Sequence, residues 1–264
     1  MKEKITNKTV LITGAGTGIG KAIAYKMAEK GAHLLLTGLD IENLNAVKEK
    51  CTAMGVKAAA HTVDLSAASS VDALVEYINE NQINIDIFVL NAGISQRAYT
   101  LDTSFDVDKK IMEVNFFGSV YLIKKFAEKI KTGRLTQIAV TTSISGLFGF
   151  PLRSSYCASK HALFGFFESL DLEYDNISVT FLIPGRINTQ ISKNALLADG
   201  KAYEKMDKGQ ESGMDVEKCA KIAIRAIEKK RRRKLIGKHE LLMVYINKFL
   251  PGLYYKLAKN ISAT

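Results

Sequence analysis

Apolar residues along this chain fall into two alternating patterns. Short, nearly continuous apolar runs, typical of strands buried on both faces, are separated by longer segments whose apolar residues recur with helical spacing. The expected strands are 9–13, 33–37, 57–63, 85–90, 137–142, 178–183 and a short last strand at 234–237. The expected helices are 19–30, 41–54, 66–81, 105–131 as one long helix, 154–174 and 215–230. Residues 187–213 follow neither pattern and are expected to be irregular.

Strands that alternate with helices predict an α/β protein whose parallel sheet carries helices on both faces. The sequence has no Pro-rich linker, low-complexity segment or internal repeat, so we expect one folded domain over residues 1–240. Residues 241–264 form an apolar and basic tail that either packs on this domain or lies at a membrane surface. Side chains that directly follow strands are the first candidates for a binding site, because open parallel sheets bind ligands at the carboxyl ends of their strands.

A glycine-rich string joins the first expected strand to the first helix. It reads Thr-Gly-Ala-Gly-Thr-Gly-Ile-Gly, and Gly14, Gly18 and Gly20 follow the spacing Gly-x-x-x-Gly-x-Gly. Glycines let the backbone turn tightly and approach a pyrophosphate, and the helix that follows offers free N–H groups and a positive dipole end. Its position between a strand and a helix predicts a dinucleotide site. The alternative is a glycine-rich turn without a ligand.

Tyr156 and Lys160 lie at the start of an expected helix, at positions i and i+4. Residues at this spacing share a helix face, so the ammonium should lie near the phenol and lower its pKa from about 10. A tyrosine so placed can take a proton from an alcohol as hydride leaves, or give one to a carbonyl. By itself, such a pair is more often a surface or packing pair.

Other polar residues follow neighbouring strands. Ser143 comes directly after the fifth expected strand, and Asn91 begins an Asn-Ala-Gly sequence after the fourth. The Ser143 hydroxyl could hold a substrate oxygen beside Tyr156. Asn115 lies within the long expected helix. Taken singly, Asn115 is equally a tolerated polar residue, and Ser143 is equally a helix or turn cap.

Together these motifs make residues 5–240 resemble the short-chain dehydrogenase/reductase family. The resemblance is carried by Thr-Gly-x-x-x-Gly-x-Gly at 13–20, Asn-Ala-Gly at 91–93, Ser143, Tyr156-x-x-x-Lys160 and Pro184-Gly185. It implies a Rossmann-type doubly wound sheet of about seven strands in the order 3-2-1-4-5-6-7. It also implies an oxidoreductase that moves hydride between NAD or NADP and an alcohol or ketone, and that forms a homodimer or homotetramer.

The resemblance assigns roles to individual residues. The catalytic residues would be Asn115, Ser143, Tyr156 and Lys160. Lys160 would also bind the nicotinamide ribose, and Asn115 would help to hold a water that relays protons. The cofactor-binding residues would be Gly14, Thr17, Gly18, Ile19, Gly20, Gly38, Asp64, Leu65, Asn91, Ala92, Gly93, Tyr156, Lys160, Pro184, Gly185, Ile187 and Thr189. Asp64 would face the adenine, Ile187 and Thr189 would touch the carboxamide, and residues 187–213 would form the substrate lid.

The end of the second expected strand bears on the choice of cofactor. An acidic residue there binds the ribose 2′-hydroxyl, whereas a cationic residue accepts a 2′-phosphate. Family members that use NAD usually carry Asp where Gly38 stands, and those that use NADP often carry Arg where Leu39 stands. Gly38 leaves room for a phosphate, while Asp40 favours NAD unless it caps the next helix, the commoner use of Asp there. We therefore expect NADP, and NAD stays open.

Positive charge is concentrated near the C-terminus. The net charge is +10, and residues 225–264 carry 11 Lys or Arg against two Asp or Glu. Apolar runs at 241–246 and 249–255 follow the basic run 229–234. Such a combination can bind an anionic membrane surface. The other interpretation is a solvated helix end followed by a helix that packs on the substrate cleft; nucleic-acid binding lacks a recognition motif.

Composition bears on location and function. The three cysteines are far apart, no Cys/His spacing suggests a metal site, and residues 1–10 contain no apolar stretch typical of a signal peptide. We therefore expect a cytoplasmic protein without a metal. Apolar residues that follow Ser143 and lie in 187–213 favour a bulky apolar substrate, or are ordinary packing. The competing function is a non-catalytic Rossmann module, either a cofactor sensor or a membrane-docked binding protein.

Overall fold

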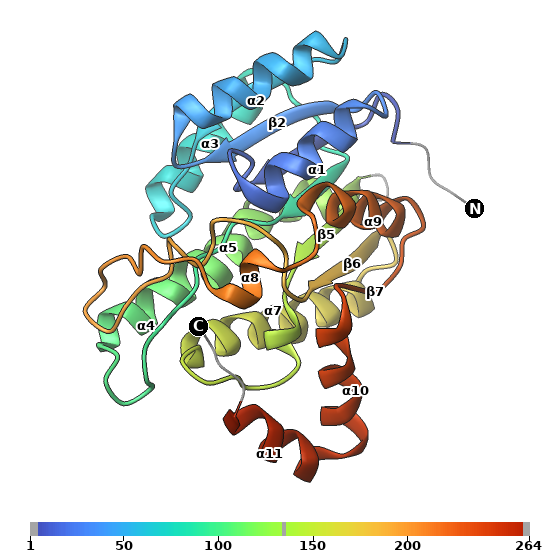
Figure 1. Cartoon of the computed structure of the whole chain (residues 1–264). Coiled ribbons are helices and arrows are strands. Elements are labelled where there is room, and N and C mark those ends of the chain that lie inside the picture. Colours follow the sequence, from blue (N-terminus) through green and yellow to red (C-terminus); the bar gives the residue numbers. More distant parts are fainter. Residues whose placement is uncertain (1–4, 134–135, 261–264) are drawn as a thin grey trace.

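Seven strands lie parallel in one sheet, in the order β3-β2-β1-β4-β5-β6-β7 (Figure 1). They are β1 Thr9–Thr13, β2 His33–Gly38, β3 Ala58–Thr62, β4 Ile87–Leu90, β5 Thr136–Thr141, β6 Ile177–Pro184 and β7 Arg233–Ile236. The strand order and direction confirm the fold that the sequence predicts. This computed structural model describes residues 5–133 and 136–260. The other residues of the expected domain and tail lie outside the described part.

Helices cover both faces of the sheet (Figure 1). They are α1 Gly18–Ala28, α2 Ile41–Ala53, α3 Ala68–Glu80, α4 Phe105–Met112, α5 Gly118–Lys125, α6 Ala127–Thr132, α7 Ser154–Glu173, α8 Lys208–Glu211, α9 Val216–Glu228, α10 Leu242–Phe249 and α11 Pro251–Asn260. Helices α1, α2 and α9 pack on one face, and α3, α5 and α7 pack on the other.

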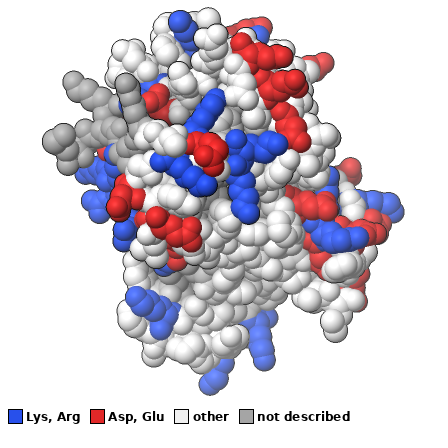
Figure 2. Space-filling view, turned by 180° about the vertical axis from the view of Figure 1, so that it is seen from behind, with Lys and Arg blue, Asp and Glu red and all other residues white. Residues whose placement is uncertain are grey.

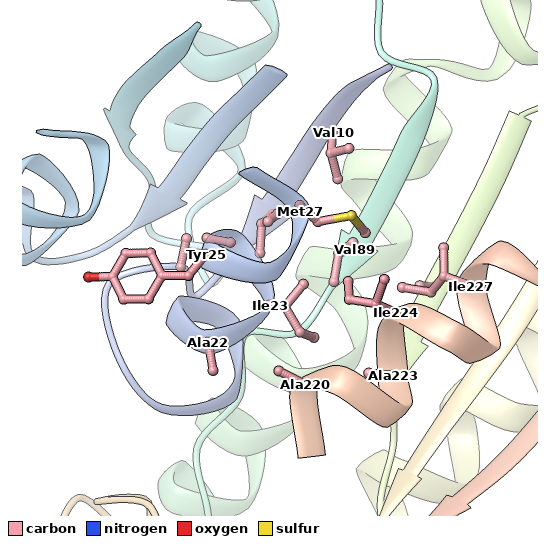
Figure 3. Close-up of a cluster of buried hydrophobic side chains, with 14 of the residues drawn as sticks. Val10, Ala22, Ile23, Tyr25, Met27, Val89, Ala220, Ala223, Ile224 and Ile227 are labelled. Carbon is pink, nitrogen blue, oxygen red and sulfur yellow. The ribbon is translucent and has the colours of Figure 1, made fainter. Parts of the chain in front are cut away.

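Neighbouring residues of β1 belong to different hydrophobic clusters. Val10 and Ile12 pack in the cluster that contains α1 and α9, whereas Leu11 packs in the cluster on the opposite face. Figure 3 shows the first cluster, in which Ile23 of α1 and Ile224 of α9 lie beside Val89 of β4. Because both faces of the sheet are covered, the consecutive residues Val10, Leu11 and Ile12 are all apolar. This double burial explains why the strand sequences do not alternate between apolar and polar residues.

The single helix expected over 105–131 is interrupted twice. Residues Glu113–Phe117 form a π-helical turn between α4 and α5, and the chain breaks again at Phe126 before α6. The π turn contains Asn115, whose side chain bonds the backbone of Ile94 in the loop after β4. Single π turns within helices are frequent at functional sites. This one is stabilised by a residue outside the helix, so helical periodicity did not reveal it.

The C-terminal part of the chain is helical beyond β7, as one of the two interpretations of the tail expected. Residues 187–213 are largely irregular, as expected, apart from the short α8. Beyond β7 and a 3₁₀ turn at His239–Leu241, α10 and α11 form a helix pair that we call the C-terminal helix pair. The pair bends at Leu250, and Pro251 begins α11, where a missing backbone N–H costs no helical hydrogen bond.

The strand order creates a crevice at one edge of the sheet. Strand β1 leads outward to β2 and β3, while its other neighbour, β4, leads to β5, β6 and β7. The carboxyl ends of β1 and β4 therefore diverge into loops on opposite sides, which is where doubly wound sheets bind ligands. The loops after β1, β4, β5 and β6 meet at this edge and supply the candidate site.

Candidate active site

The glycine-rich turn between β1 and α1 has no room for side chains at its narrowest point. A Cβ at Gly20 would lie 2.2 Å from the carbonyl oxygen of Gly14 and 2.6 Å from Asn91 Nδ2. Gly14 and Gly18 have φ values of +64° and +52°, in the left-handed region that glycine adopts at little cost. The turn thus brings bare backbone to the start of α1, and Gly18 is the first residue of that helix.

Hydrogen bonds hold this turn against the loop after β4. The Thr13 hydroxyl accepts from the backbone N–H of Asn91 at 2.9 Å and from that of Ala92 at 3.0 Å. In return, Asn91 Nδ2 donates to the carbonyl oxygens of Thr13 at 3.2 Å and Gly14 at 3.4 Å. Asn91 therefore fixes the two sides of the crevice at a set distance.

Asn115 and Lys160 meet across Gly93. A Cβ on Gly93 would lie 3.1 Å from Asn115 Oδ1 and 3.3 Å from Lys160 Nζ, so a larger residue would push both aside. Asn115 Oδ1 accepts from the Ile94 N–H at 2.8 Å, and its Nδ2 donates to the Ile94 carbonyl and to Ser159 Oγ, both at 3.0 Å. Both N–H donors of the Asn115 amide and one lone pair of Oδ1 thus join the π turn to the β4 loop and α7.

Lys160 is buried on the inner side of α7. Its side chain reaches the end of β5, where Nζ donates to the carbonyl oxygen of Thr141 at 2.9 Å. Burial disfavours the ammonium and lowers the pKa of Lys160 to about 8. The residue can therefore change its protonation state near neutral pH, unlike a solvent-exposed lysine.

Tyr156 and Ser143 lie together beside Lys160. Burial raises the pKa of Tyr156, while the hydrogen-bonding Ser143 hydroxyl and the positive charge of Arg153 oppose that rise. The expectation that Lys160 lowers this pKa is therefore wrong for the protein alone. Lys160 Nζ lies 5.8 Å from the centre of the Tyr156 ring, and burial disfavours its own charge. Desolvation of the phenolate is the larger effect.

The match to a family model decides the family. Residues 8–199 match the model described as short chain dehydrogenase. The chain belongs to the short-chain dehydrogenase/reductase family. Members of this family are oxidoreductases, and the resemblance noted from the motifs is confirmed. The matched segment includes the glycine-rich turn, Asn115 and the Tyr156–Lys160 pair.

Known relatives of this short-chain dehydrogenase cover nearly all of the chain. "Dehydrogenase/reductase SDR family member 7B" of Xenopus laevis is 36% identical over 94% of this chain and 80% of its own length. "Dehydrogenase/reductase SDR family protein 7-like" of Drosophila melanogaster is 33% identical over 96% and 80%. An SDR from Burkholderia phymatum, crystallised with NAD, is 24% identical with a TM-score of 0.82, covering 95% of this chain and 96% of its own. An alcohol dehydrogenase from Thermococcus sibiricus, complexed with 5-hydroxy-NADP, is 25% identical with a TM-score of 0.75, covering 88% and 97%.

Most of the residues predicted from the sequence border one cleft at the carboxyl edge of the sheet. These are Gly14, Thr17, Gly18, Ile19, Asn91, Ala92, Gly93, Ser143, Tyr156, Lys160, Pro184, Gly185, Ile187 and Thr189. They come from the ends of β1, β4, β5 and β6 and from the start of α7. The cleft therefore extends continuously from the glycine-rich turn to the Tyr156 hydroxyl.

Five of the predicted residues do not border the cleft: Gly20, Gly38, Asp64, Leu65 and Asn115. Gly20 and Asn115 lie behind the residues that line the cleft and hold them in place through the contacts described above. The Asp64 carboxylate accepts from the N–H and hydroxyl of Ser66 at 2.9 and 2.6 Å, and those bonds lower its pKa. Asp40 accepts from the Asn43 N–H at 3.0 Å as the N-cap of α2, which confirms its expected capping role.

The sequence did not reveal three charged residues at the cleft, of which Arg97 and Asp207 are buried. Arg97 and Arg153 border it, and Asp207 in the loop after β6 pairs with both. Arg97 follows the Asn-Ala-Gly motif closely, and Arg153 precedes Tyr156 by one helical turn. Their closeness to these motifs was a signal in the sequence, but their meeting with Asp207 depends on the fold.

A second cavity, of about 310 Å³, adjoins the Tyr156 end of the cleft. Ser143 and Arg153 border both cavities, and Phe148, Phe150 and Met243 line the second. The C-terminal helix pair closes this side through Tyr254, which is 2% exposed, packs with its ring centre 4.9 Å from that of Phe148, and donates a hydrogen bond to the Gly149 carbonyl.

Residues 5–133 and 136–260 contain neither a membrane-spanning helix nor a cluster of metal ligands. No described helix has the length and apolar character needed to cross a bilayer. Within the same residues, no cluster of three or more His, Cys, Asp or Glu side chains could hold a metal ion.

Proposed function

We propose that this protein transfers hydride between a nicotinamide cofactor, NAD or NADP, and a secondary alcohol or ketone. The observation that carries the proposal is the burial of Tyr156, Ser143 and Lys160 together at one end of a cleft whose other end is the glycine-rich turn. A dinucleotide fits such a cleft, because backbone N–H groups at a helix start bind phosphates and the glycines Gly14 and Gly18 line this end of the cleft.

In this proposal each polar residue either transfers a proton or orients the substrate or the cofactor. The bound nicotinamide supplies or accepts the hydride. The Tyr156 hydroxyl gives a proton to the carbonyl oxygen in reduction and takes it back in oxidation, while Ser143 orients that oxygen. Because burial raises its pKa, Tyr156 holds its proton at neutral pH, which suits reduction. Lys160 and Asn115 position the ribose and a proton-relaying water.

The remaining cofactor contacts follow from position in the cleft. Thr17, Gly18 and Ile19 at the start of α1 would meet the pyrophosphate, and Ile187 and Thr189 after β6 would meet the carboxamide. Gly20, Gly38, Asp64 and Leu65 would support the adenosine end from behind or beside the cleft.

We propose NADP as the preferred form of the cofactor. Asp40 is engaged as the N-cap of α2, so its carboxylate is already used outside a ribose contact. Gly38 at the end of β2 adds neither bulk nor negative charge. The ratio of kcat/KM for NADPH and NADH tests this, and a strong preference for NADH would overturn it.

Replacing Tyr156 by Phe tests the catalytic role. We expect kcat/KM for ketone reduction, followed at 340 nm, to fall by at least about 100-fold, because general acid catalysis contributes about 10²–10⁴-fold. Tyr255→Phe is the matched control, since Tyr255 is exposed and does not line the cleft. NADPH titration should give the same affinity for all three proteins. Unchanged turnover by the Tyr156→Phe variant would contradict the proposal, and cofactor binding without turnover by the wild type would favour the non-catalytic cofactor sensor.

We further propose that part of the substrate is apolar and occupies the second cavity. The lid residue Ile191 borders the cleft, and Phe148, Phe150 and Met243 supply apolar walls next to Ser143. If a panel of ketones showed turnover of small sugars alone, this part of the proposal would be wrong.

We also propose a cytoplasmic homodimer or homotetramer. Its three cysteines are free and buried, as in proteins of reducing compartments. Phe105 and Phe117, which are 73% and 55% exposed, flank an open apolar depression at α4 and α7. Phe164 and Phe167, also on α7, are instead buried in the core. Sedimentation equilibrium of the wild type and of Phe117→Glu tests this contact.

Finally, we propose that the C-terminal helix pair docks on anionic membrane surfaces. Phe249, Leu250 and Tyr255 are more than half exposed, and residues 241–264 contain three lysines and neither Asp nor Glu. At the lowest end of Figure 2, where Figure 1 places these helices, the surface is white with scattered blue and no red. Apolar side chains beside lysines are typical of helices that lie at a membrane interface.

A further inference from the structure

Glu240 places a buried carboxylate on the wall of the second cavity. The residue belongs to the 3₁₀ turn between β7 and α10, is 9% exposed, and lines the cavity together with Phe148 and Met243. No Lys, Arg or His within residues 5–133 and 136–260 forms an ion pair with it. Acidic side chains are almost never buried this deeply unless they are paired, so this one calls for an explanation.

One oxygen of this carboxylate binds the backbone. Oε1 accepts from the N–H of Arg186 at 2.9 Å and from that of Lys238 at 3.1 Å, and so joins the loops that follow β6 and β7. A Cβ at Gly185 or at Gly237 would clash with this oxygen, so backbone without side chains is needed on both sides of it. Oε1 therefore has a fixed position and a structural role.

The other oxygen, Oε2, has no such role. It accepts no hydrogen bond from the part of the chain that the structure describes, and it remains accessible although most of the side chain is buried. A carboxylate oxygen can accept two hydrogen bonds. Because Glu240 lines the second cavity, this accessible oxygen is the acceptor that the residue presents there.

The same cavity extends to the proposed reaction centre. Ser143, which orients the substrate oxygen in the proposed function, borders both the second cavity and the cofactor cleft. Phe148, Phe150 and Met243 supply apolar walls to the second cavity. A substrate held at Ser143 can thus extend along apolar surface to a carboxylate oxygen. A wholly apolar substrate would leave that oxygen out of water and without a donor, which costs free energy.

We propose that the substrate carries a hydrogen-bond donor, a hydroxyl or an amino group, which binds Oε2 of Glu240 while the carbonyl lies at Tyr156 and Ser143. This rests on the proposed oxidoreductase function and narrows its substrate class to ketones or alcohols with an apolar middle and a donor at the far end. Glu240 determines specificity and does not touch the reacting atoms.

The other role open to Glu240 is structural. Through Oε1 it holds the chain beside Pro184 and Gly185, which line the cofactor cleft, so a structural role alone would affect every substrate and NADPH equally. Recognition of a donor affects only substrates that carry one. Glu240→Gln separates the two roles, because its amide oxygen can still accept from the backbone while its NH₂ group replaces Oε2 by a donor.

The experiment compares matched ketones in matched variants. Acetophenones with a para hydroxyalkyl arm of graded length are each paired with the methyl ether, which keeps the oxygen and loses the donor. The corresponding aminoalkyl compounds form a second arm. We would measure kcat/KM with NADPH for the wild type, Glu240→Gln and the control Glu76→Gln, which alters an exposed glutamate on α3. Calorimetry on the protein loaded with NADP⁺ measures ketone binding without turnover.

We expect the wild type and Glu76→Gln to prefer the hydroxyl compound over its ether by about 10- to 100-fold at the best-fitting length, the size of a hydrogen bond to a charged group. Glu240→Gln should reverse this preference, because the ether oxygen can accept from the new amide, and should bind NADPH as the wild type does. The ratio of amine to hydroxyl turnover identifies the donor.

A crystal structure of the wild type with NADP⁺ and the best hydroxyl compound tests the contact even if Glu240→Gln does not fold. We expect the hydroxyl oxygen within hydrogen-bond distance of Glu240 Oε2. A hydroxyl that points away from this oxygen would overturn the inference.

Two kinetic results would also overturn it. The wild type could turn over both members of each pair equally, because water satisfies Oε2 as well as a substrate does. Glu240→Gln could instead slow both members equally and weaken NADPH binding, which would make the role of Glu240 structural. Donor-dependent binding that Glu240→Gln abolishes, without turnover of any ketone, would support this site and refute the proposed oxidoreductase activity. Turnover without a donor preference would refute this site alone.

Discussion

Among the glycines of the glycine-rich turn, Gly20 has the least space for a Cβ atom. The space that a Cβ would need is taken by a backbone oxygen and by an amide that fixes the loop after β4. Because neither is the end of a flexible side chain, the turn itself would have to move. The consequences should therefore extend from stability to cofactor binding.

We expect Gly20→Ala to lower the free energy of unfolding by about 1–3 kcal/mol, the usual cost of overpacking, and to weaken NADPH binding. Gly165→Ala is the control, since Gly165 is an exposed glycine within α7 with no atom within 4 Å of its Cβ position. That substitution should stabilise the protein by about 0.5–1 kcal/mol, because glycine is a poor helix former. Urea unfolding and NADPH titration of both variants measure the two effects; equal behaviour would contradict the crowding argument.

Lys160 should make stability depend on pH in a definite direction. Its pKa is about 8 in the folded protein, against 10.5 for an unburied lysine. Between these values the unfolded chain holds the proton more tightly, so the free energy of unfolding should rise with pH. The rise should total about 3 kcal/mol relative to Lys160→Met, which lacks the group, at about 1.4 kcal/mol per pH unit.

Urea unfolding of the wild type and of Lys160→Met at a series of pH values measures this difference, and other titrating groups cancel in the comparison. Below pH 8 the difference should be flat, because both states are protonated. A difference that stays constant through pH 10, or that falls, would show that burial does not disfavour the ammonium.

For individual residues, the sequence predicted which residue types form the site, but it did not predict how deeply the fold buries them or which charges lie beside them. The spacing of Tyr156 and Lys160 placed them on one helix face, and both border the cleft. The predicted direction of the pKa shift of Tyr156 was wrong, because the shift depends on how deeply the fold buries the phenol. The pairing of Arg153 with Asp207 was not predicted for a similar reason: the two residues are distant in sequence and meet only in the folded chain.

At the scale of elements, the C-terminal helix pair is attached to the rest of the protein through few side chains. Tyr254 and Ala258 of α11 pack with Phe148 in a small cluster separate from the two main ones. That cluster forms one wall of the second cavity, so the stability of these helices and the shape of the proposed substrate pocket are linked. The neighbouring Tyr255 is 65% exposed and has little part in the attachment.

Tyr254→Ala should detach these helices without unfolding the sheet. Loss of a buried aromatic side chain costs about 3–5 kcal/mol, and here it falls on a small peripheral cluster. Hydrogen exchange should show lost protection in residues 242–260 and unchanged protection in β1, β4 and β5. Tyr255→Ala, an exposed change at the next position, should alter stability by less than about 0.5 kcal/mol. If both variants exchange alike, Tyr254 is not the attachment point.

The elements were predicted well where their pattern is local. Each expected strand is present, and the ends of the main helices differ by a few residues. The interruption at Glu113–Phe117 was missed, because it depends on the bonds between Asn115 and Ile94 rather than on the helix's own sequence. In the tail, one interpretation of the sequence expected a helix, and the structure has two, α10 and α11.

At the scale of the whole molecule, charge and apolar surface are unevenly distributed. The basic residues of 225–264 account for nearly all the net charge, and the exposed apolar side chains of the C-terminal helix pair lie in the same part of the chain. A surface of this kind should recognise an anionic bilayer by combined apolar and electrostatic contact.

Phe249→Glu should abolish co-sedimentation with vesicles that contain phosphatidylserine, because it places a negative charge among exposed apolar side chains. Leu172→Glu is the control, since Leu172 is 76% exposed on α7, outside this helix pair. Wild-type binding should weaken with salt and be small on phosphatidylcholine alone. Point changes are preferable to truncation, which would also remove Tyr254. Equal binding by both variants, or no wild-type binding to anionic vesicles, would contradict membrane docking.

The sequence by itself determined the strands and the main helices, the parallel sheet, the glycine-rich turn and the spacing of Tyr156 and Lys160. These are encoded in periodicity and in motifs whose members lie close together along the chain. Only the tertiary structure decided which side chains share a protonation environment, where the π turn falls, and that Arg97, Arg153 and Asp207 meet beside the phenol. The physical reason is that burial and charge pairing depend on distance in space, and folding brings together residues that are more than 100 positions apart, such as Arg97 and Asp207.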